Sequence, residues 1–212
     1  RECLSYLAEH RREVLATLDR AAKQAVEAGL KPDSSDRVAI RAKLAARSDP
    51  ADVKGFEVRP TRAAAVGASD TPSRPNASDK PEDYTVEFVD RCEPTLEVAR
   101  PLAYAIPHDQ SRVADMLLKH GIALERLAEP VSCEVELVRA EKIETTAAPF
   151  NRHRLRTATV VTRREHRDLS AGSFIVRTAQ PLGNLAVYLL EPASDDGLAT
   201  WNFFVFIQMI IC

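Results

Sequence analysis

Hydrophobic positions along the chain follow two different periods, and each period predicts a different kind of element. Residues 2–28 carry apolar side chains at helical spacing, so they predict one amphipathic helix that ends at Gly29 and Pro32. After residue 33 apolar and polar positions alternate, which is typical of half-buried strands. Strands are therefore predicted at residues 37–45, 53–60 and 84–90.

Residues 60–83 interrupt this pattern, since they are rich in Pro, Ala, Ser and Asp. Such a composition buries little and predicts a loop or linker. The segment includes Asn76-Ala77-Ser78, a glycosylation sequon that matters only if the source glycosylates; the simpler interpretation is an exposed loop.

The second half of the chain mixes both periods. Residues 101–107 predict a short buried strand, and residues 108–122 predict a helix capped by Gly121. A returning strand at 123–130 would complete one β-α-β unit over residues 101–129. The inward side of the helix is predicted to carry Val113, Met116, Leu117 and Leu118.

Four more elements are predicted after this unit. They are strands at 131–144, 154–166 and 172–178, and a short helix at 180–192 that is stopped by Pro192. The sum predicts an α+β fold, in which an N-terminal amphipathic helix precedes a mixed, strand-rich domain. We divide the chain into a helix (1–30), strands with a linker (31–83), an α/β domain (84–204) and an apolar tail (205–212).

Composition narrows the classes of function. The 212 residues carry a net charge of −2, so nothing global favours nucleic acid or an anionic membrane. The apolar run at 201–212 is shorter than the roughly 20 residues of a membrane-spanning helix. The cysteines are too far apart for a zinc knuckle or a dense disulfide framework, although one long-range disulfide stays open; they are Cys3, Cys92, Cys133 and Cys212.

Two candidate sites have simple structural interpretations. His10 and Glu13 form a His-x-x-Glu pair, but a zinc site needs a third, converging ligand, and a solvated helix face explains the pair. Residues 152–167 contain six Arg and two His, which could contact a phosphate backbone. The segment has no aromatic residues on which bases could stack. Pairing with the acidic strand before it explains both segments, so we expect no specific nucleic-acid binding.

The other candidates lie at the ends of predicted helices. We expect His108 and Asp109 to cap a helix N-terminus, and His120 to lie at the C-terminal end of the same helix. The carboxylates of Glu191, Asp195 and Asp196 could bind a metal, but they have no His or Cys nearby. A turn at 194–197, with Gly197 in an unusual φ, explains them. The aromatic residues that follow are predicted to seal either the core of the domain or its seam with a neighbouring domain; these are Trp201, Phe203 and Phe204. No residue is therefore assigned a catalytic, cofactor-binding or metal role.

Several ordered motifs carry a resemblance to a known family. Residues 100–127 contain Pro-x-x-Tyr and His-Gly-Ile motifs, and residues 171–204 contain Gln-Pro, Leu-Leu-Glu-Pro, Asp-Gly and Trp. Together they resemble the region downstream of the catalytic domain in bacterial zinc carboxypeptidases of the carboxypeptidase A (funnelin) superfamily. The opening helix is similar to the helix that closes the catalytic domain there.

This resemblance implies a parent hydrolase that removes C-terminal residues from peptides through a zinc-bound water. The family's zinc ligands and general base would lie upstream of Arg1, so none is transferred to this chain. It implies that the partners are the upstream catalytic domain and the parent's peptide substrate, and that the parent is periplasmic or secreted. The family continues with polar residues after the aromatic block, so the apolar tail at 205–212 predicts a truncation or a frameshift.

The sequence leaves two classes of function open. The first is the non-catalytic C-terminal portion of a zinc metallocarboxypeptidase-like protein, inactive by itself. The second is a stand-alone module that binds a peptide, a carbohydrate or a partner protein, because the chain is strand-rich and assembles no catalytic group.

Overall fold

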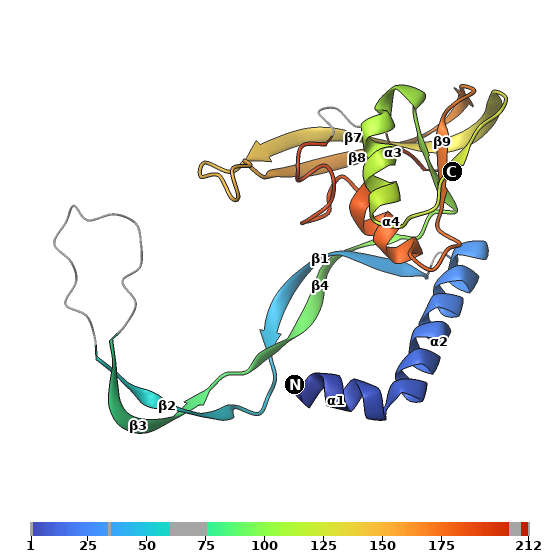
Figure 1. Cartoon of the computed structure of the whole chain (residues 1–212). Helices are drawn as coiled ribbons and strands as arrows, with labels where there is room; N and C mark the ends of the chain where they lie inside the picture. The colour runs from blue at the N-terminus through green and yellow to red at the C-terminus, as the bar shows by residue number, and fades with distance from the viewer. Residues whose placement is uncertain (1, 34, 60–75, 204–208, 212) are drawn as a thin grey trace. The chain divides into compact units, whose positions relative to one another are not determined.

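The structure is a computed structural model that describes residues 2–33, 35–59, 76–203 and 209–211. The fold is α+β, as predicted, with an N-terminal helical segment and a larger content of strand (Figure 1). The chain forms two compact units. Unit 1 consists of Arg1–Ala42 and Pro94–Cys212, and unit 2 is Lys43–Glu93.

Helices and strands follow one another in the order drawn in Figure 1. The helical elements are α1 (Glu2–Glu9), α2 (Arg11–Leu30), the 3-10 helix η1 (His108–Gln110), α3 (Ser111–Lys119) and α4 (Gly183–Leu190). The strands are β1 (Arg37–Ala46), β2 (Ala51–Arg59), β3 (Asn76–Val86), β4 (Val89–Ala99), β5 (Ala103–Ile106), β6 (Glu125–Arg126), β7 (Val131–Thr145), β8 (Arg156–Leu169), β9 (Phe174–Arg177) and β10 (Met209–Ile211).

Six strands of unit 1 form one sheet in the order β6-β9-β5-β10-β7-β8. Both β5 and β6 run antiparallel to β9, so they are parallel to each other. This arrangement confirms the predicted β-α-β unit, with β9 inserted between its two strands. The predicted returning strand at 123–130 is much shorter than expected, because only Glu125 and Arg126 pair with β9.

The predicted apolar tail lies partly outside the described residues, which include only Met209–Ile211 of it. These three residues form β10, which pairs antiparallel with β5 on one side and with β7 on the other. Their backbone therefore occupies a central position in the sheet.

The core of unit 1 lies between the helices α3 and α4 and the strands β5 and β9. Val113 and Leu117 of α3 are buried in it, as predicted, and Met116 is partly buried against it. Leu118 was predicted to point inward, but its side chain is 54% exposed. Successive helical residues differ by about 100°, so the residue after Leu117 turns away from the core. Gly121 ends the helix with φ +81°, which confirms the predicted cap.

The predicted N-terminal helix differs from the observed one in two respects. It is interrupted at His10, which separates α1 from α2, and its second part continues to Leu30. Neither helix is deeply buried, because Gly29 is the only residue that is buried in the described part of α1 and α2.

Two short two-stranded sheets complete the structure: β1 pairs with β4, and β2 pairs antiparallel with β3. Residues 76–83 were predicted to be linker, but they belong to β3. Their backbone pairs with β2 from Asn76 opposite Arg59 onward, so main-chain hydrogen bonds outweigh an unfavourable composition. The rest of the predicted linker lies outside the described residues. The predicted strand at 84–90 is instead the end of β3 and the start of β4.

Candidate functional site

Unit 1 contains a cavity of about 690 Å³, and every residue that lines it belongs to this unit. Cavities of about 300–1,000 Å³ are typical of small-molecule sites in proteins. Most of its wall is apolar, with a few charged side chains among the aliphatic ones. The cavity is therefore the best candidate site in the described part of the chain.

One wall of the cavity is a face of the β7–β8 ribbon. Side chains alternate between the two faces of a strand, and the residues of β7 and β8 that line the cavity follow this alternation except for Val135. The register places Glu136 opposite Arg164 and Val138 opposite Thr162. The wall is thus aliphatic at one end and charged at the other; its residues include Glu134, Glu136, Val138, Val160, Thr162 and Arg164.

The charges on this wall form the cross-strand pairs that the sequence predicted. Arg164 Nε lies 2.7 Å from Glu136 Oε1, and His166 Nδ1 lies 3.6 Å from Glu134 Oε1. Both pairs are largely exposed to solvent, so each is worth at most about 1 kcal/mol. Within the basic segment at 152–167, Arg164 and His166 therefore face the neighbouring acidic strand, as expected. Arg163 and Arg167 instead pair with Glu165 of their own strand.

The opposite wall comes from β1, β4 and the segment after β4. Consecutive residues from Val98 to Leu102 line the cavity, together with Leu96 and Ile40. Because consecutive side chains of an extended segment point in opposite directions, such a run brings the main chain itself to the cavity.

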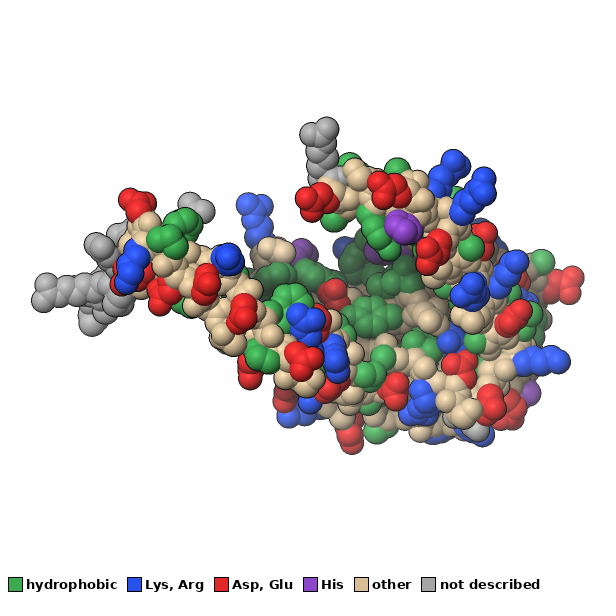
Figure 2. Space-filling view, turned by 90° about the horizontal axis from the view of Figure 1, so that it is seen from below, with side chains coloured by type: hydrophobic (Ala, Val, Ile, Leu, Met, Phe, Trp, Pro, Cys, Tyr) green, Lys and Arg blue, Asp and Glu red, His purple; other side chains and the backbone are tan. Residues whose placement is uncertain are grey.

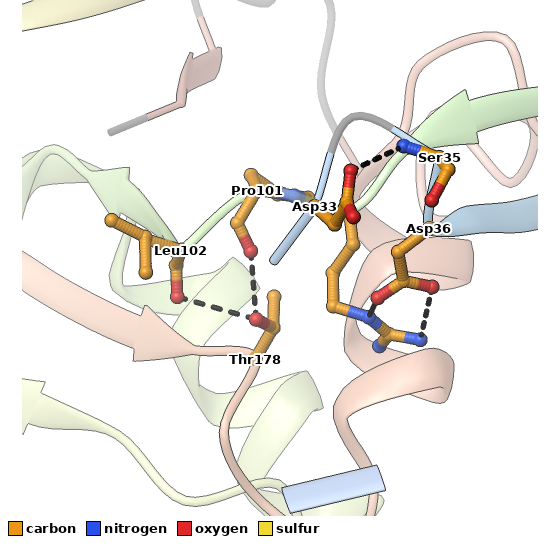
Figure 3. Close-up of polar contacts among 7 residues, drawn as sticks. Asp33, Ser35, Asp36, Pro101, Leu102 and Thr178 are labelled. Atoms are coloured by element: carbon orange, nitrogen blue, oxygen red, sulfur yellow. Dashed lines mark hydrogen bonds and ion pairs between the residues drawn. The ribbon is translucent and has the colours of Figure 1, made fainter. Parts of the chain in front are cut away.

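Arg100 is the buried cation of this wall, and its side chain is only 5% exposed. Its Nε donates to Asp36 Oδ2 at 2.5 Å, and its Nη2 donates to Asp36 Oδ1 at 3.4 Å (Figure 3). Among the described residues, its buried Nη1 has no hydrogen-bond partner. Asp36 therefore neutralises the guanidinium but leaves one of its donors unsatisfied.

The neighbouring segment is held by Thr178, whose hydroxyl donates to the carbonyl of Pro101 at 2.7 Å and lies 3.3 Å from that of Leu102. Figure 3 shows the Thr178 hydroxyl directed at these two carbonyls. These contacts fix the main chain where it leaves β4 and passes along the cavity.

Glu191 contributes a buried carboxyl group, since the residue is only 5% exposed and lines the cavity. Tyr104, which is fully buried in β5, donates its hydroxyl proton to Glu191 Oε1 at 2.8 Å. Burial raises the pKa of Glu191, the hydrogen bond from Tyr104 lowers it, and the charge of Glu136 raises it further. Burial also raises the pKa of Tyr104, and the charge of Glu191 adds to this effect.

A second cluster of polar side chains lies across the β7–β8 ribbon. Ser132 Oγ lies 2.8 Å from His166 Nε2, and His166 also faces Glu134, which is the connectivity of a nucleophile, a base and an orienting acid. However, Ser132 donates its proton to Asp168 Oδ1 at 2.5 Å, so the imidazole is not its proton acceptor. His166 and Glu134 are also 62% and 77% exposed. We interpret the cluster as a solvated surface network.

The His-x-x-Glu pair lies on an exposed helical segment, in agreement with its structural interpretation. His10 Nδ1 is 3.5 Å from Glu13 Oε2, and the imidazole stacks on the ring of Tyr6. Within the described residues, no group of three or more His, Cys, Asp or Glu side chains could hold a metal ion. Among the described residues, His10 and Glu13 therefore have no third potential ligand beside them.

The acidic turn after α4 separates its three carboxylates. Glu191 bonds Tyr104, Asp195 Oδ1 accepts from Tyr188 at 2.5 Å, and Asp196 accepts from the indole of Trp201. Gly197 does not have the predicted positive φ. It is required for space instead, because a Cβ there would lie 2.9 Å from Ser194 Cβ and 3.0 Å from the carbonyl of Tyr188.

The remaining candidates also have structural places. His108 begins η1 on the surface, and the backbone N–H of His120 caps α3 by donating to Met116 and Leu117. Phe203 packs against the core, as predicted, while Phe204 lies outside the described residues.

The described cysteines Cys3, Cys92 and Cys133 are free thiols. No described helix is long and apolar enough to cross a membrane.

Sequence reasoning singled out Glu191 but missed its partner Tyr104 and the buried Arg100–Asp36 pair. Arg100 and Tyr104 received no role, although a charged residue beside Pro101 and a phenol within an apolar strand are both unusual for buried positions. Those two features were the available signals. Comparison with protein-family models, curated proteins and solved structures gives no significant match.

Proposed function

We propose that this chain is the non-catalytic C-terminal portion of a zinc metallocarboxypeptidase-like protein, and that it packs on an upstream catalytic domain. The proposal starts from the ordered motifs that resemble that family. The parent reaction would be hydrolysis of C-terminal peptide bonds by a zinc-activated water. We assign no step of that reaction to this chain, because among the described residues His10 and Glu13 have no third potential ligand beside them.

The observation that carries the proposal is the apolar face of α1 and α2. Leu4 and Leu7 are 73% and 47% exposed, and Leu15 and Leu18 are 49% and 60% exposed. Each pair is spaced by three residues and so lies on one side of its helix. Figure 2 shows hydrophobic side chains at the surface between acidic and basic ones. Exposed apolar side chains arranged in this way mark an interaction surface, and the similar helix in the family closes the catalytic domain.

The residues of the family-like motifs support a structural role for the C-terminal block. The Gln180 side chain bonds the backbone of Ala123 and Arg177, and Glu191 anchors α4 to Tyr104. Trp201 bonds Asp196 across the turn. A block whose most specific residues are occupied in this way maintains the fold and leaves the hydrolysis to another domain.

Hydrogen exchange tests the packing. We expect the amides of α1 and α2 to exchange more slowly in the native, longer polypeptide than in the isolated chain. The amides of α3 serve as the internal control, because Val113 and Leu117 of α3 already pack in the core of unit 1. Equal exchange of α1 and α2 in both forms would rule out a docked helix pair.

Zinc binding and peptidase assays test the absence of catalysis. The purified chain should hold far less than one zinc per molecule and should not hydrolyse a C-terminally blocked or free peptide. Stoichiometric zinc that disappears, together with peptidase activity, in His10→Ala would overturn the proposal. Glu9→Ala is the matched control on the same exposed helical segment.

A stand-alone binding module is the second candidate, because the cavity in unit 1 has the size and the mixed lining of a ligand site. The two candidates differ in what precedes Arg1. An upstream region with His-x-x-Glu and a later His favours the peptidase, whereas an unrelated domain favours the module.

A further inference from the structure

We propose that the cavity of unit 1 binds a short peptide in extended conformation, as an added strand beside β4. The inference rests on the cavity and its polar groups alone, so it holds whether or not the chain belongs to a carboxypeptidase.

Among the described residues, one edge of β4 can accept an added strand. In the described part of the chain, β4 pairs only with β1, so its other edge has no partner strand. The far side of β1 is covered, because Asp195 N donates to the carbonyl of Ile40 at 3.1 Å and Ala42 N donates to the Asp195 carboxylate. No described strand therefore occupies this edge of β4, and peptide recognition by strand addition uses such an edge.

The position of the cavity along β4 supports this geometry. Leu96, Val98 and Ala99 line it, and they are followed directly by Arg100 and Pro101. The carbonyl of Glu97 accepts a hydrogen bond from Arg37 Nη2 at 2.9 Å, and a carbonyl oxygen has two lone pairs. The cavity thus borders the backbone of β4 over its last residues.

Arg100 carries an unsatisfied donor. Its Nη1 is buried and lacks a partner among the described residues, and a buried donor left unpaired is unfavourable. Asp36 already balances the charge of the guanidinium. A neutral acceptor is therefore sufficient, and the carbonyl of a peptide bond is one.

Glu191 lines the same cavity, and its carboxyl group can accept a hydrogen bond from the N–H of a peptide bond. The cavity thus offers an acceptor for a peptide N–H (Glu191) and a donor for a peptide C=O (Arg100), which together complement a peptide backbone. A simple anion fits less well, because Glu191 and Glu136 would repel it.

The apolar part of the lining specifies the side chains. Aliphatic groups from both walls surround the space between these polar groups; they include Ile40, Leu96, Val98, Val138, Val160 and Ala193. We therefore expect the bound peptide to carry aliphatic residues at alternate positions, whose side chains would lie against this lining.

Fluorescence anisotropy with the full chain tests the proposal. The probe is a fluorescein-labelled Gly-Val-Thr-Val-Ile-Gly peptide, and the control probe is the same peptide with all of its backbone amides N-methylated, which cannot donate the strand hydrogen bonds. Unlabelled octanoate is the competitor that represents an apolar anion. We expect saturable binding of the first probe, at least about tenfold weaker binding of the second, and little displacement by octanoate.

Two variants locate the binding. Val160→Phe fills the cavity and should weaken binding at least about tenfold, whereas Val161→Phe, on the opposite face of β8, should leave it within about twofold. Glu191→Gln keeps an oxygen that accepts from Tyr104 but removes the charge, so we expect about fivefold weaker binding. Glu129→Gln, at an exposed position, is its control and should bind like the unsubstituted chain.

Circular dichroism of each variant separates loss of binding from loss of fold, and only variants with the unsubstituted chain's spectrum are compared. The proposal is overturned if the labelled peptide shows no saturable binding, if Val160→Phe binds like Val161→Phe, or if the N-methylated probe binds equally well. Displacement by octanoate at a similar concentration would instead identify a site for apolar anions. Because none of these outcomes involves zinc or hydrolysis, the test does not depend on the parent enzyme.

Discussion

Replacing Tyr104 with Phe removes one hydroxyl group from a buried contact of unit 1. Tyr104 is fully buried, and its hydroxyl lies 2.8 Å from Glu191 Oε1. Glu191 is itself only 5% exposed. In the variant the Glu191 carboxyl loses this donor and remains buried. A hydrogen bond to a charged group contributes about 1.5–3 kcal/mol, so we expect the free energy of unfolding to fall by about 2 kcal/mol.

For a protein of this length, about 2 kcal/mol corresponds to a decrease of roughly 4–8 °C in Tm. Urea titration followed by tryptophan fluorescence measures the change, because Trp201 is the only tryptophan and lies in unit 1. Tyr188→Phe is the matched control. It also removes a phenol–carboxylate hydrogen bond, at 2.5 Å to Asp195, but at a more exposed position, and should cost about 1 kcal/mol or less.

The pH dependence of the same variant gives an independent check. Burial raises the pKa of Glu191 in the folded chain above its ordinary value, while the hydrogen bond from Tyr104 lowers it. Between the pKa that Glu191 has in the unfolded chain and its higher pKa in the folded chain, the folded state holds a proton that the unfolded state has lost. The free energy of unfolding therefore decreases as pH rises through this window. Without the Tyr104 hydroxyl the folded pKa rises further. The deficit of Tyr104→Phe should therefore be larger at about pH 7 than at about pH 4.5.

Two results would refute this reasoning. One is a loss of less than about 0.5 kcal/mol at about pH 7, which is the range of ordinary surface substitutions. The other is a deficit that stays the same at both pH values, since the hydroxyl would then not interact with the charge of Glu191.

Three further substitutions have expected outcomes. Gly183→Ala places a Cβ 2.0 Å from the carbonyl oxygen of Thr178, so we expect the free energy of unfolding in urea to fall by about 3 kcal/mol. Gly55→Ala is the control and should cost less, because its Cβ would come no closer than 3.1 Å to the Tyr84 ring. Leu18→Lys should leave the free energy of urea unfolding within about 0.5 kcal/mol, because the side chain is 60% exposed; a loss of more than about 1 kcal/mol would contradict this. Arg164→Ala should cost less than about 1 kcal/mol, with a smaller effect at high salt, since its ion pair with Glu136 is solvated; a larger, salt-independent loss would contradict this.

Local patterns predicted much of the fold because their causes are local. The alternation in β1 and the opposite charges of β7 and β8 placed these strands correctly, and Val113 and Leu117 identified the buried face of α3. The failures occurred where tertiary pairing outweighs composition. Residues 76–83 look like linker in sequence, but β2 provides hydrogen bonds to their backbone.

The candidate site could not be predicted in the same way, because its contacts are distant in sequence. Arg100 bonds Asp36 across 64 positions, and Tyr104 bonds Glu191 across 87. No periodic pattern encodes such pairs. The sequence could indicate that Glu191 is a carboxyl at the end of an apolar helix, but only the folded chain brings it to a cavity that Arg100 also lines.

The most direct test of the proposed function is peptide mapping of the native polypeptide that carries this sequence, combined with measurement of its zinc content. Our account predicts peptides from a region upstream of Arg1 that contains a His-x-x-Glu motif and a later His, together with one zinc per molecule. It also predicts that His10→Ala leaves that zinc in place. A native polypeptide without such a region, or one whose zinc is lost in His10→Ala, would contradict the proposal.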